Sequence, residues 1–211
     1  MADRYFGRNA GKVTVKGSRA SRKQREILGR ALAYADKHNA PYAAKLALVS
    51  ALIVESEAKN LSSASADGYG SYGVLQGRDI YHSRKNLMNP EYQFSVFLGK
   101  NKKWRKGFTS KGNAIELARR GMAPGDIAQT VEGSAYPDRY ALYINEAKKI
   151  IRAYRGANQG GSAPLRGGGS GGVRAPDNQR QQALLALAQS YTTGRSRKVK
   201  PVLPDWTKVS G

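Results

Sequence analysis

The chain has 211 residues, and 40% of them are hydrophobic, which is enough for one domain of ordinary size with a core. It contains no cysteine, which excludes disulfides and cysteine-based metal sites, and it has no apolar run of about 18 residues that would cross a membrane. The formal net charge of +21 favours polyanionic partners such as nucleic acid, acidic wall polymers or acidic proteins, without distinguishing between them.

The first half of the chain predicts an arm followed by two helices. Residues 1–20 are polar, basic and glycine-containing, so we expect an arm that orders only against a partner. Ser21 precedes an amphipathic pattern and predicts a capped helix that is broken before Pro41. From Tyr42 to about Lys59 the sequence is apolar on nearly every side, which predicts the buried central helix of the domain.

The middle of the chain predicts further helices beyond a small non-helical segment. Residues 60–76 are rich in Ser, Ala and Gly, which favours a loop or a small hairpin. Capping residues and apolar periodicity predict helices over 91–99, 113–120, from 124, and over 139–154. Together these elements predict a mainly α domain over residues 21–155 with one small irregular or β lobe.

The composition changes abruptly after Gly156. Residues 156–176 contain GGSAPLRGGGSGG, which predicts a flexible linker. Residues 177–211 then combine an amphipathic helix with a basic, proline-containing tail. Because a lone amphipathic helix beyond a long linker has no second apolar surface of its own, we expect it to dock on a partner rather than fold back.

Glu55 is the candidate catalytic residue of the central helix. Leu48, Leu52 and Glu55 lie at i, i+4 and i+7, so the carboxyl shares a face with apolar neighbours. Burial of that kind raises the pKa of a carboxyl, as a general acid working near neutral pH requires. Glu57 is the rival, but two steps of ~100° place it about 160° from that face, so we expect it to be solvated. An exposed, purely structural Glu55 is the alternative.

The segment that follows Glu55 carries a resemblance to a known family. Glu55-Ser56, a short polar stretch and then Gly70-Ser-Tyr-Gly-Val-Leu-Gln76 are similar to the signature of lytic transglycosylases and goose-type lysozymes. The resemblance covers roughly residues 21–155 and implies a lysozyme-like α-helical fold. It also implies cleavage of the β-1,4 bond between N-acetylmuramic acid and N-acetylglucosamine, without metal or cofactor. Glu55 would then act first as general acid and later as base.

The resemblance also implies roles for residues near Glu55. Ser56 and Gln76 would hold the glutamate or the N-acetyl groups of the sugar by hydrogen bonds. Gly70, Ser71 and Gly73 would contact the glycan, the glycines by letting the backbone approach it closely.

Two features leave the reaction type open. Asp67 is a candidate second carboxylate that would position a water and favour hydrolysis, although it is also an ordinary turn residue. The family carries a late Tyr-Asn-x-Gly segment, whereas residues 128–134 read AQTVEGS here. Tyr136 or Tyr140 would have to replace the missing tyrosine, and Gln129 would take part of its role. The sequence therefore does not decide between hydrolase and transglycosylase.

The layout of the chain is similar to that of bacteriophage virion-associated lysozymes, which are carried in the tail or ejected with the genome. The first residues, MADRYFGRNAGKV, lack the pattern of a signal peptide, so we expect another route of delivery to a cell wall. The expected partners are a peptidoglycan strand, and other tail proteins bound through residues 177–211 and the N-terminal arm. Nonspecific contact with DNA is also expected from the charge. The alternative is an inactive structural virion protein with a lysozyme-like module.

Overall fold

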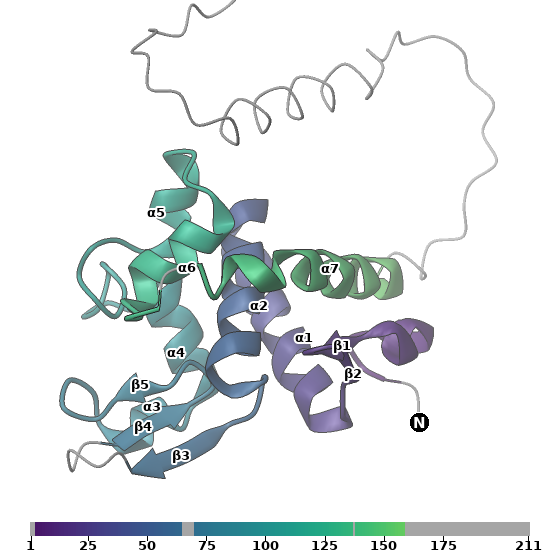
Figure 1. Cartoon of the computed structure of the whole chain (residues 1–211), viewed down its shortest axis with the longest axis horizontal. Helices are drawn as coiled ribbons and strands as arrows, with labels where there is room; N and C mark the ends of the chain where they lie inside the picture. The colour runs from purple at the N-terminus through teal and green to yellow at the C-terminus, as the bar shows by residue number, and fades with distance from the viewer. Residues whose placement is uncertain (1–2, 65–69, 137, 159–211) are drawn as a thin grey trace, which may run out of the picture. The chain divides into compact units, whose positions relative to one another are not determined.

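The computed structural model describes residues 3–64, 70–136 and 138–158, which all belong to one compact unit. This part of the chain is mainly helical and contains two small antiparallel sheets, which confirms the predicted mainly α class (Figure 1). The predicted linker, the C-terminal helix and Asp67 lie outside the described residues.

The helices largely follow the predicted pattern. Ser21 accepts a hydrogen bond from the backbone of Gln24, and the Gln24 side chain accepts one in return, so a complete capping box starts the first helix. Asn113 caps a later helix as expected. No described helix is long and apolar enough to cross a membrane. The helices are α1 (Arg22–Lys37), α2 (Tyr42–Ser56), α3 (Arg84–Leu87), α4 (Pro90–Phe97), α5 (Ala114–Arg119), α6 (Pro124–Glu132) and α7 (Ile144–Asn158), with a 3-10 turn η2 (Ala141–Tyr143) before α7.

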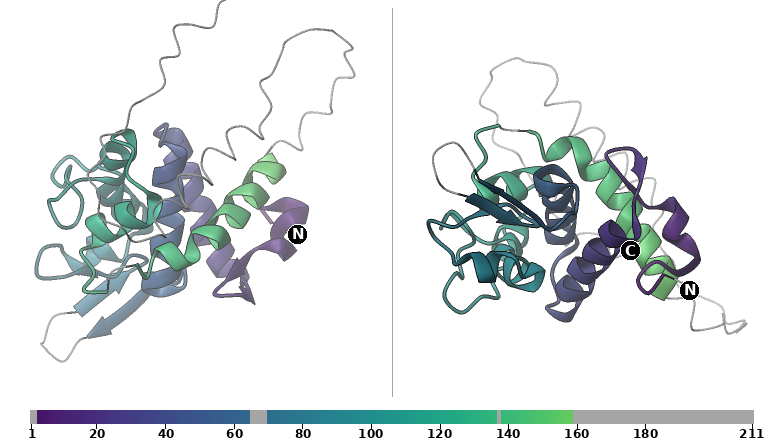
Figure 2. Two further views of the ribbon diagram at one scale, coloured as in Figure 1. Left: turned by 45° about the horizontal axis from the view of Figure 1, so that its top comes forward. Right: turned by 90° about the horizontal axis from the view of Figure 1, so that it is seen from below.

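Helix α2 is the centre of the core. It buries 11 of its 15 residues and packs against α1, α5, α6 and α7 (Figures 1 and 2). This agrees with a helix whose sequence is apolar on nearly every side. The helix ends where Glu57 adopts a left-handed conformation with φ of 55°. Glu55 therefore lies in the last turn of the most buried helix.

The small lobe is a three-stranded antiparallel sheet in the order β3 (Leu61–Ala64), β4 (Gly70–Gly73) and β5 (Gly77–Arg78). Ser62 pairs with Tyr72, and Tyr72 pairs with Gly77 on its other side. The sheet follows α2 directly and lies beside α3 (Figure 1). It places the Gly70–Gln76 segment next to the end of α2.

The first residues differ from the predicted arm, because they fold onto the helical unit. A 3-10 helix η1 (Gly7–Lys12) is followed by a hairpin of β1 (Thr14–Val15) and β2 (Ser18–Arg19). Phe6 is fully buried and meets the ring of Tyr154 of α7 edge to face, with centroids 6.1 Å apart. The arm was predicted from its polar composition, but its few apolar residues are the ones that become buried.

Polar contacts also fix this N-terminal segment on α7. Glu146 accepts hydrogen bonds from the Thr14 hydroxyl at 2.5 Å and from the backbone of Lys16 and Gly17 at 3.1 Å each. One carboxylate of α7 thus satisfies the donors of the tight β1–β2 turn. Residues 3–20 thus pack on the helical unit of their own chain.

Truncating Phe6 tests this packing. We expect Phe6→Ala to lower the free energy of unfolding by about 3–5 kcal/mol, as for other buried phenylalanines. Leu142→Ala is the matched control, because Leu142 is 78% exposed and should cost less than about 0.5 kcal/mol. Urea unfolding followed by circular dichroism measures both, and an unchanged Phe6→Ala variant would show that the N-terminal segment is not part of the core.

Candidate functional site

Glu55 lies at the edge of the hydrophobic core, and a hydrogen bond fixes one of its carboxyl oxygens. Its side chain is 16% exposed. The Tyr140 hydroxyl donates a hydrogen bond of 2.5 Å to Glu55 Oε1. Oε2 accepts no hydrogen bond from any residue that the structure describes. One carboxyl oxygen is therefore fixed, and the other is available to a ligand.

Tyr140 is placed for this contact by its own backbone. The Ser50 hydroxyl of α2 donates a hydrogen bond of 2.5 Å to the Tyr140 carbonyl, and the whole of Tyr140 is buried. Burial first, and then the carboxylates of Glu132 and Glu55, raise the pKa of the Tyr140 hydroxyl. The hydroxyl therefore keeps its proton and acts as a donor to Glu55. The structure thus selects Tyr140 from the two tyrosines that the sequence left open.

Tyr136, the other candidate, does not reach the site. Its side chain is 71% exposed, and its backbone nitrogen donates to the Ser134 hydroxyl. The sequence could not separate the two tyrosines, because the position of either one relative to Glu55 depends on how distant segments pack.

Arg139 and Glu132 complete the charged surroundings of Glu55. The Arg139 guanidinium lies 3.7 Å from Glu55 Oε1, and it also donates to the Val54 carbonyl at 3.4 Å. Glu132 ends α6, where Gly133 adopts the left-handed conformation that closes the helix. Burial, and next the charge of Glu55, raise the pKa of the Glu132 carboxyl well above its ordinary value, although Arg139 opposes the shift. Sequence reasoning assigned no role to either residue.

Ser56 supports the site from behind instead of facing it. It is 3% exposed, and its hydroxyl donates to the Val74 carbonyl at 2.7 Å. This contact joins the end of α2 to the segment after β4. The expected hydrogen bond from Ser56 to the catalytic glutamate or to the sugar is thus replaced by a bond to the backbone of the small lobe.

Gln93 of α4 organises the same segment and was missed in the sequence. It is fully buried, its Nε2 donates to the carbonyls of Tyr72 and Leu87, and its Oε1 accepts from the Leu75 nitrogen at 2.6 Å. A Cβ atom at Gly73 would lie 2.0 Å from Gln93 Nε2, and Gly73 has φ of +80°. Gly73 is therefore required by the approach of Gln93, whereas the sequence suggested an approach of the glycan. A polar residue within the apolar stretch of α4 was the available signal.

The remaining predicted residues take different positions. Gly70 is buried, and a Cβ there would meet the ring of Tyr72 at 2.1 Å, so packing again explains the glycine. Ser71 is half-buried in β4. Gln129 donates to the Ser134 carbonyl at 2.5 Å, while its own Oε1 is buried without a partner among the described residues. Asp67 lies outside the described residues.

Gln76 lines a cavity of about 490 Å³ that also includes Glu132. Gln76 donates to the Gly73 carbonyl at 2.8 Å. The cavity wall includes aromatic side chains and polar ones, and its full lining is Gln76, Gly77, Arg78, Tyr81, His82, Trp104, Phe108, Thr109, Ser110 and Glu132. Glu132 connects this cavity to Glu55 electrostatically. A ligand of one or two sugar rings would fit a space of this size.

His82 belongs to the aromatic wall of this cavity. Its ring contacts that of Trp104 at a tilt of 46° with centroids 4.3 Å apart, and its Nδ1 forms a hydrogen bond of 2.8 Å with the Tyr92 hydroxyl. Burial and then Lys103 lower the pKa of His82, so its ring is neutral near pH 7. His82 is 5% exposed. Among the described residues, no three His, Cys, Asp or Glu side chains group as metal ligands.

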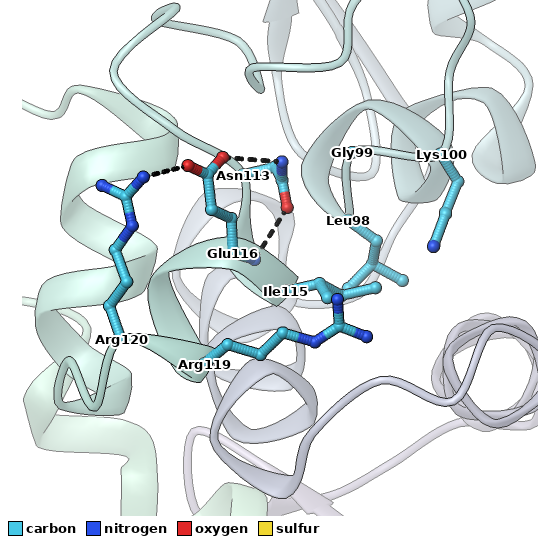
Figure 3. A pocket seen from close by; sticks show the side chains of 8 residues that line it. All are labelled: Leu98, Gly99, Lys100, Asn113, Ile115, Glu116, Arg119 and Arg120. Atoms are coloured by element: carbon cyan, nitrogen blue, oxygen red, sulfur yellow. Dashed lines mark hydrogen bonds and ion pairs between the residues drawn. The ribbon is translucent and has the colours of Figure 1, made fainter.

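A second hollow lies between the end of α4 and α5 and contains none of the predicted site residues (Figure 3). Glu116 there accepts hydrogen bonds from the Asn113 amide and from Arg120, so its carboxylate serves the start of α5 (Figure 3).

Glu57, the rival of Glu55, is paired with Lys59 at 2.7 Å and with Lys16 at 3.3 Å. Its side chain is 41% exposed, in agreement with a solvated position.

The raised pKa of Glu132 makes stability depend on pH in a defined direction. Folded Glu132 keeps its proton to higher pH than it does in the unfolded chain, so the free energy of unfolding falls as pH rises from the ordinary pKa of glutamate through the raised value. We expect Glu132→Gln to match the wild type below that window and to exceed it above, by at least about 1 kcal/mol. Urea unfolding over a pH series measures this difference. Glu57→Gln should not raise the free energy of unfolding in this way. Identical pH profiles of stability for wild type and Glu132→Gln would refute the burial of the Glu132 carboxyl.

The comparisons with known proteins do not assign the chain to a family. No protein-family model matches it, and no curated protein matches it. The resemblance noted in the sequence therefore depends on Glu55-Ser56 and on the segment from Gly70 to Gln76.

Proposed function

We propose that the protein is a lysozyme-like, peptidoglycan-degrading glycosidase in which Glu55 is the general acid and base. One observation carries the proposal: Glu55 is fixed through Oε1 by the buried Tyr140, while Oε2 accepts nothing from the described residues. The neighbouring cavity, which contains Gln76 and Glu132, supports it because its size and mixed aromatic and polar lining suit a sugar.

The chemistry follows from this arrangement. Glu55 gives its proton to the glycosidic oxygen as the bond between that oxygen and the anomeric carbon breaks, and the sugar becomes oxocarbenium-like. The carboxylate that remains is stabilised by the Tyr140 hydroxyl and by the charge of Arg139. It then takes the proton of the attacking hydroxyl. The attacking group is the C6 hydroxyl of N-acetylmuramic acid in a lytic transglycosylase, and it is a water molecule in a muramidase.

The same proposal extends to the setting of the reaction. The net charge of +21 favours contact with anionic wall polymers. The resemblance to virion-associated lysozymes supports the proposal that the protein is a phage virion component that helps to penetrate the host cell wall. Residues 177–211 would bind other virion proteins. The alternative, an inactive structural module, is an outcome of the experiments below.

Glu55→Gln tests the central role. We expect it to lower the release of soluble muropeptides from purified peptidoglycan by about 10²–10⁴-fold, because the amide cannot deliver the proton. Glu57→Gln is the matched control, since it makes the same change two residues away on an exposed side chain, and it should stay near wild type. Mass spectrometry of the soluble products is the readout, and anhydro or reducing ends identify the reaction type. Equal release by wild type and Glu55→Gln would remove Glu55 from the mechanism, and no release by either would favour the structural module.

Tyr140→Phe tests the residue that holds the acid. Loss of a hydrogen bond to a charged group removes roughly 1.5–3 kcal/mol, so we expect about a 10- to 100-fold fall in the rate of muropeptide release. Tyr136→Phe removes the same hydroxyl from an exposed ring and should leave the rate unchanged. If the two variants behaved alike, Tyr140 would not support the reaction.

A further inference from the structure

Glu132 is a second carboxyl at the proposed site that the mechanism above does not use. It lines the cavity that contains Gln76, and its Oε1 is buried without a hydrogen-bond partner among the described residues. Gln129 lies three residues earlier on the same face of α6, and its Oε1 is also buried without a partner there. Buried polar atoms are normally paired, so an unpaired carboxyl on a residue that lines a cavity points to a ligand that supplies the missing contact.

The lining of the cavity indicates the chemical class of that ligand. Trp104, Phe108 and Tyr81 present aromatic surface, while Gln76, Thr109 and Ser110 present hydrogen-bonding groups. Sugar rings have apolar C–H faces and hydroxyl edges, and an N-acetyl group adds an amide, so an N-acetylated sugar matches both kinds of wall.

We propose that Glu132 contacts the glycan directly, as a neutral carboxylic acid that donates a hydrogen bond to an oxygen of the sugar beside Gln76. The inference rests on the proposed function for the identity of the ligand, an N-acetylated glycan. It assigns the two carboxyls different tasks: Glu55 transfers the proton, and Glu132 holds the sugar.

The surroundings of Glu132 explain why it stays neutral. Burial and the charge of Glu55 raise the pKa of its carboxyl, and only Arg139 lowers it. Tyr140 lies on the same side and keeps its own proton. Across the cavity the titratable and charged groups are Arg78, Tyr81 and His82. These neighbouring groups stay unchanged when Glu132 alone is replaced.

Binding of tri-N-acetylchitotriose by the full chain, measured from pH 5 to 9, tests the proposal. Trp104 lines the cavity, and Trp206 is the other tryptophan of the chain, so Trp206→Phe leaves a fluorescent reporter at the site. In this background we expect binding to weaken about tenfold as pH rises through the pKa of Glu132. Glu132→Gln keeps a donor of the same shape, so its binding should be tight and independent of this titration. Glu132→Ala should bind about tenfold more weakly at low pH.

A second measurement serves if a variant does not fold. The side-chain carboxyl ¹³C resonance of Glu132 in the wild-type chain should shift when the trisaccharide is added. An unshifted resonance, or equal pH profiles for wild type and Glu132→Gln, would overturn the inference.

The inference and the proposed function can fail separately. Trisaccharide binding with the expected pH dependence, but without muropeptide release, would retain the glycan contact and exclude the enzyme. Release of muropeptides with no pH-dependent contribution from Glu132 would retain the enzyme and exclude the contact. Neither binding nor release would exclude both.

Discussion

The site depends on the burial of α2 and on the polar contacts that hold the small lobe against its end. Helix α2 buries 11 of its 15 residues, so it can carry a partly exposed carboxyl in a fixed position only where it emerges from the core. Glu55 lies at that point. Ser56 and Gln93 then fix the segment after β4 by hydrogen bonds to its backbone. Because those donors and acceptors are buried, losing one would leave backbone groups unpaired. The motif residues next to Glu55 thus act mainly as structural supports.

The electrostatics of the site arise from two carboxyls in unequal surroundings. Glu55 has the Tyr140 hydroxyl and the Arg139 guanidinium near its Oε1. Glu132 is half-buried with its Oε1 fully buried, and burial and the charge of Glu55 raise the pKa of its carboxyl. Two neighbouring carboxyls with different surroundings are suited to different tasks. The proposed division between proton transfer by Glu55 and sugar binding by Glu132 follows from that difference.

The sequence predicted the helical elements and the position of Glu55, because both depend on local patterns. Capping residues such as Ser21 and Asn113, and the apolar run of α2, determine these features over a few turns. It narrowed the tyrosine near Glu55 to Tyr136 or Tyr140 but could not choose between them, because Tyr140 is 85 residues away and reaches Glu55 only through packing. The N-terminal segment escaped prediction for a similar reason: Phe6 meets Tyr154 and Thr14 meets Glu146 across the fold, and polar composition gave no sign of these contacts.

The most direct test of the account is a crystal structure of the Glu55→Gln variant with an N-acetylated glycan oligomer bound. The account predicts that a glycosidic oxygen lies within hydrogen-bond distance, about 3 Å, of the amide at position 55. It also predicts that a neighbouring sugar occupies the cavity between Gln76 and Trp104. An oligomer bound elsewhere, with no sugar near position 55, would contradict the assignment of this site to glycan cleavage.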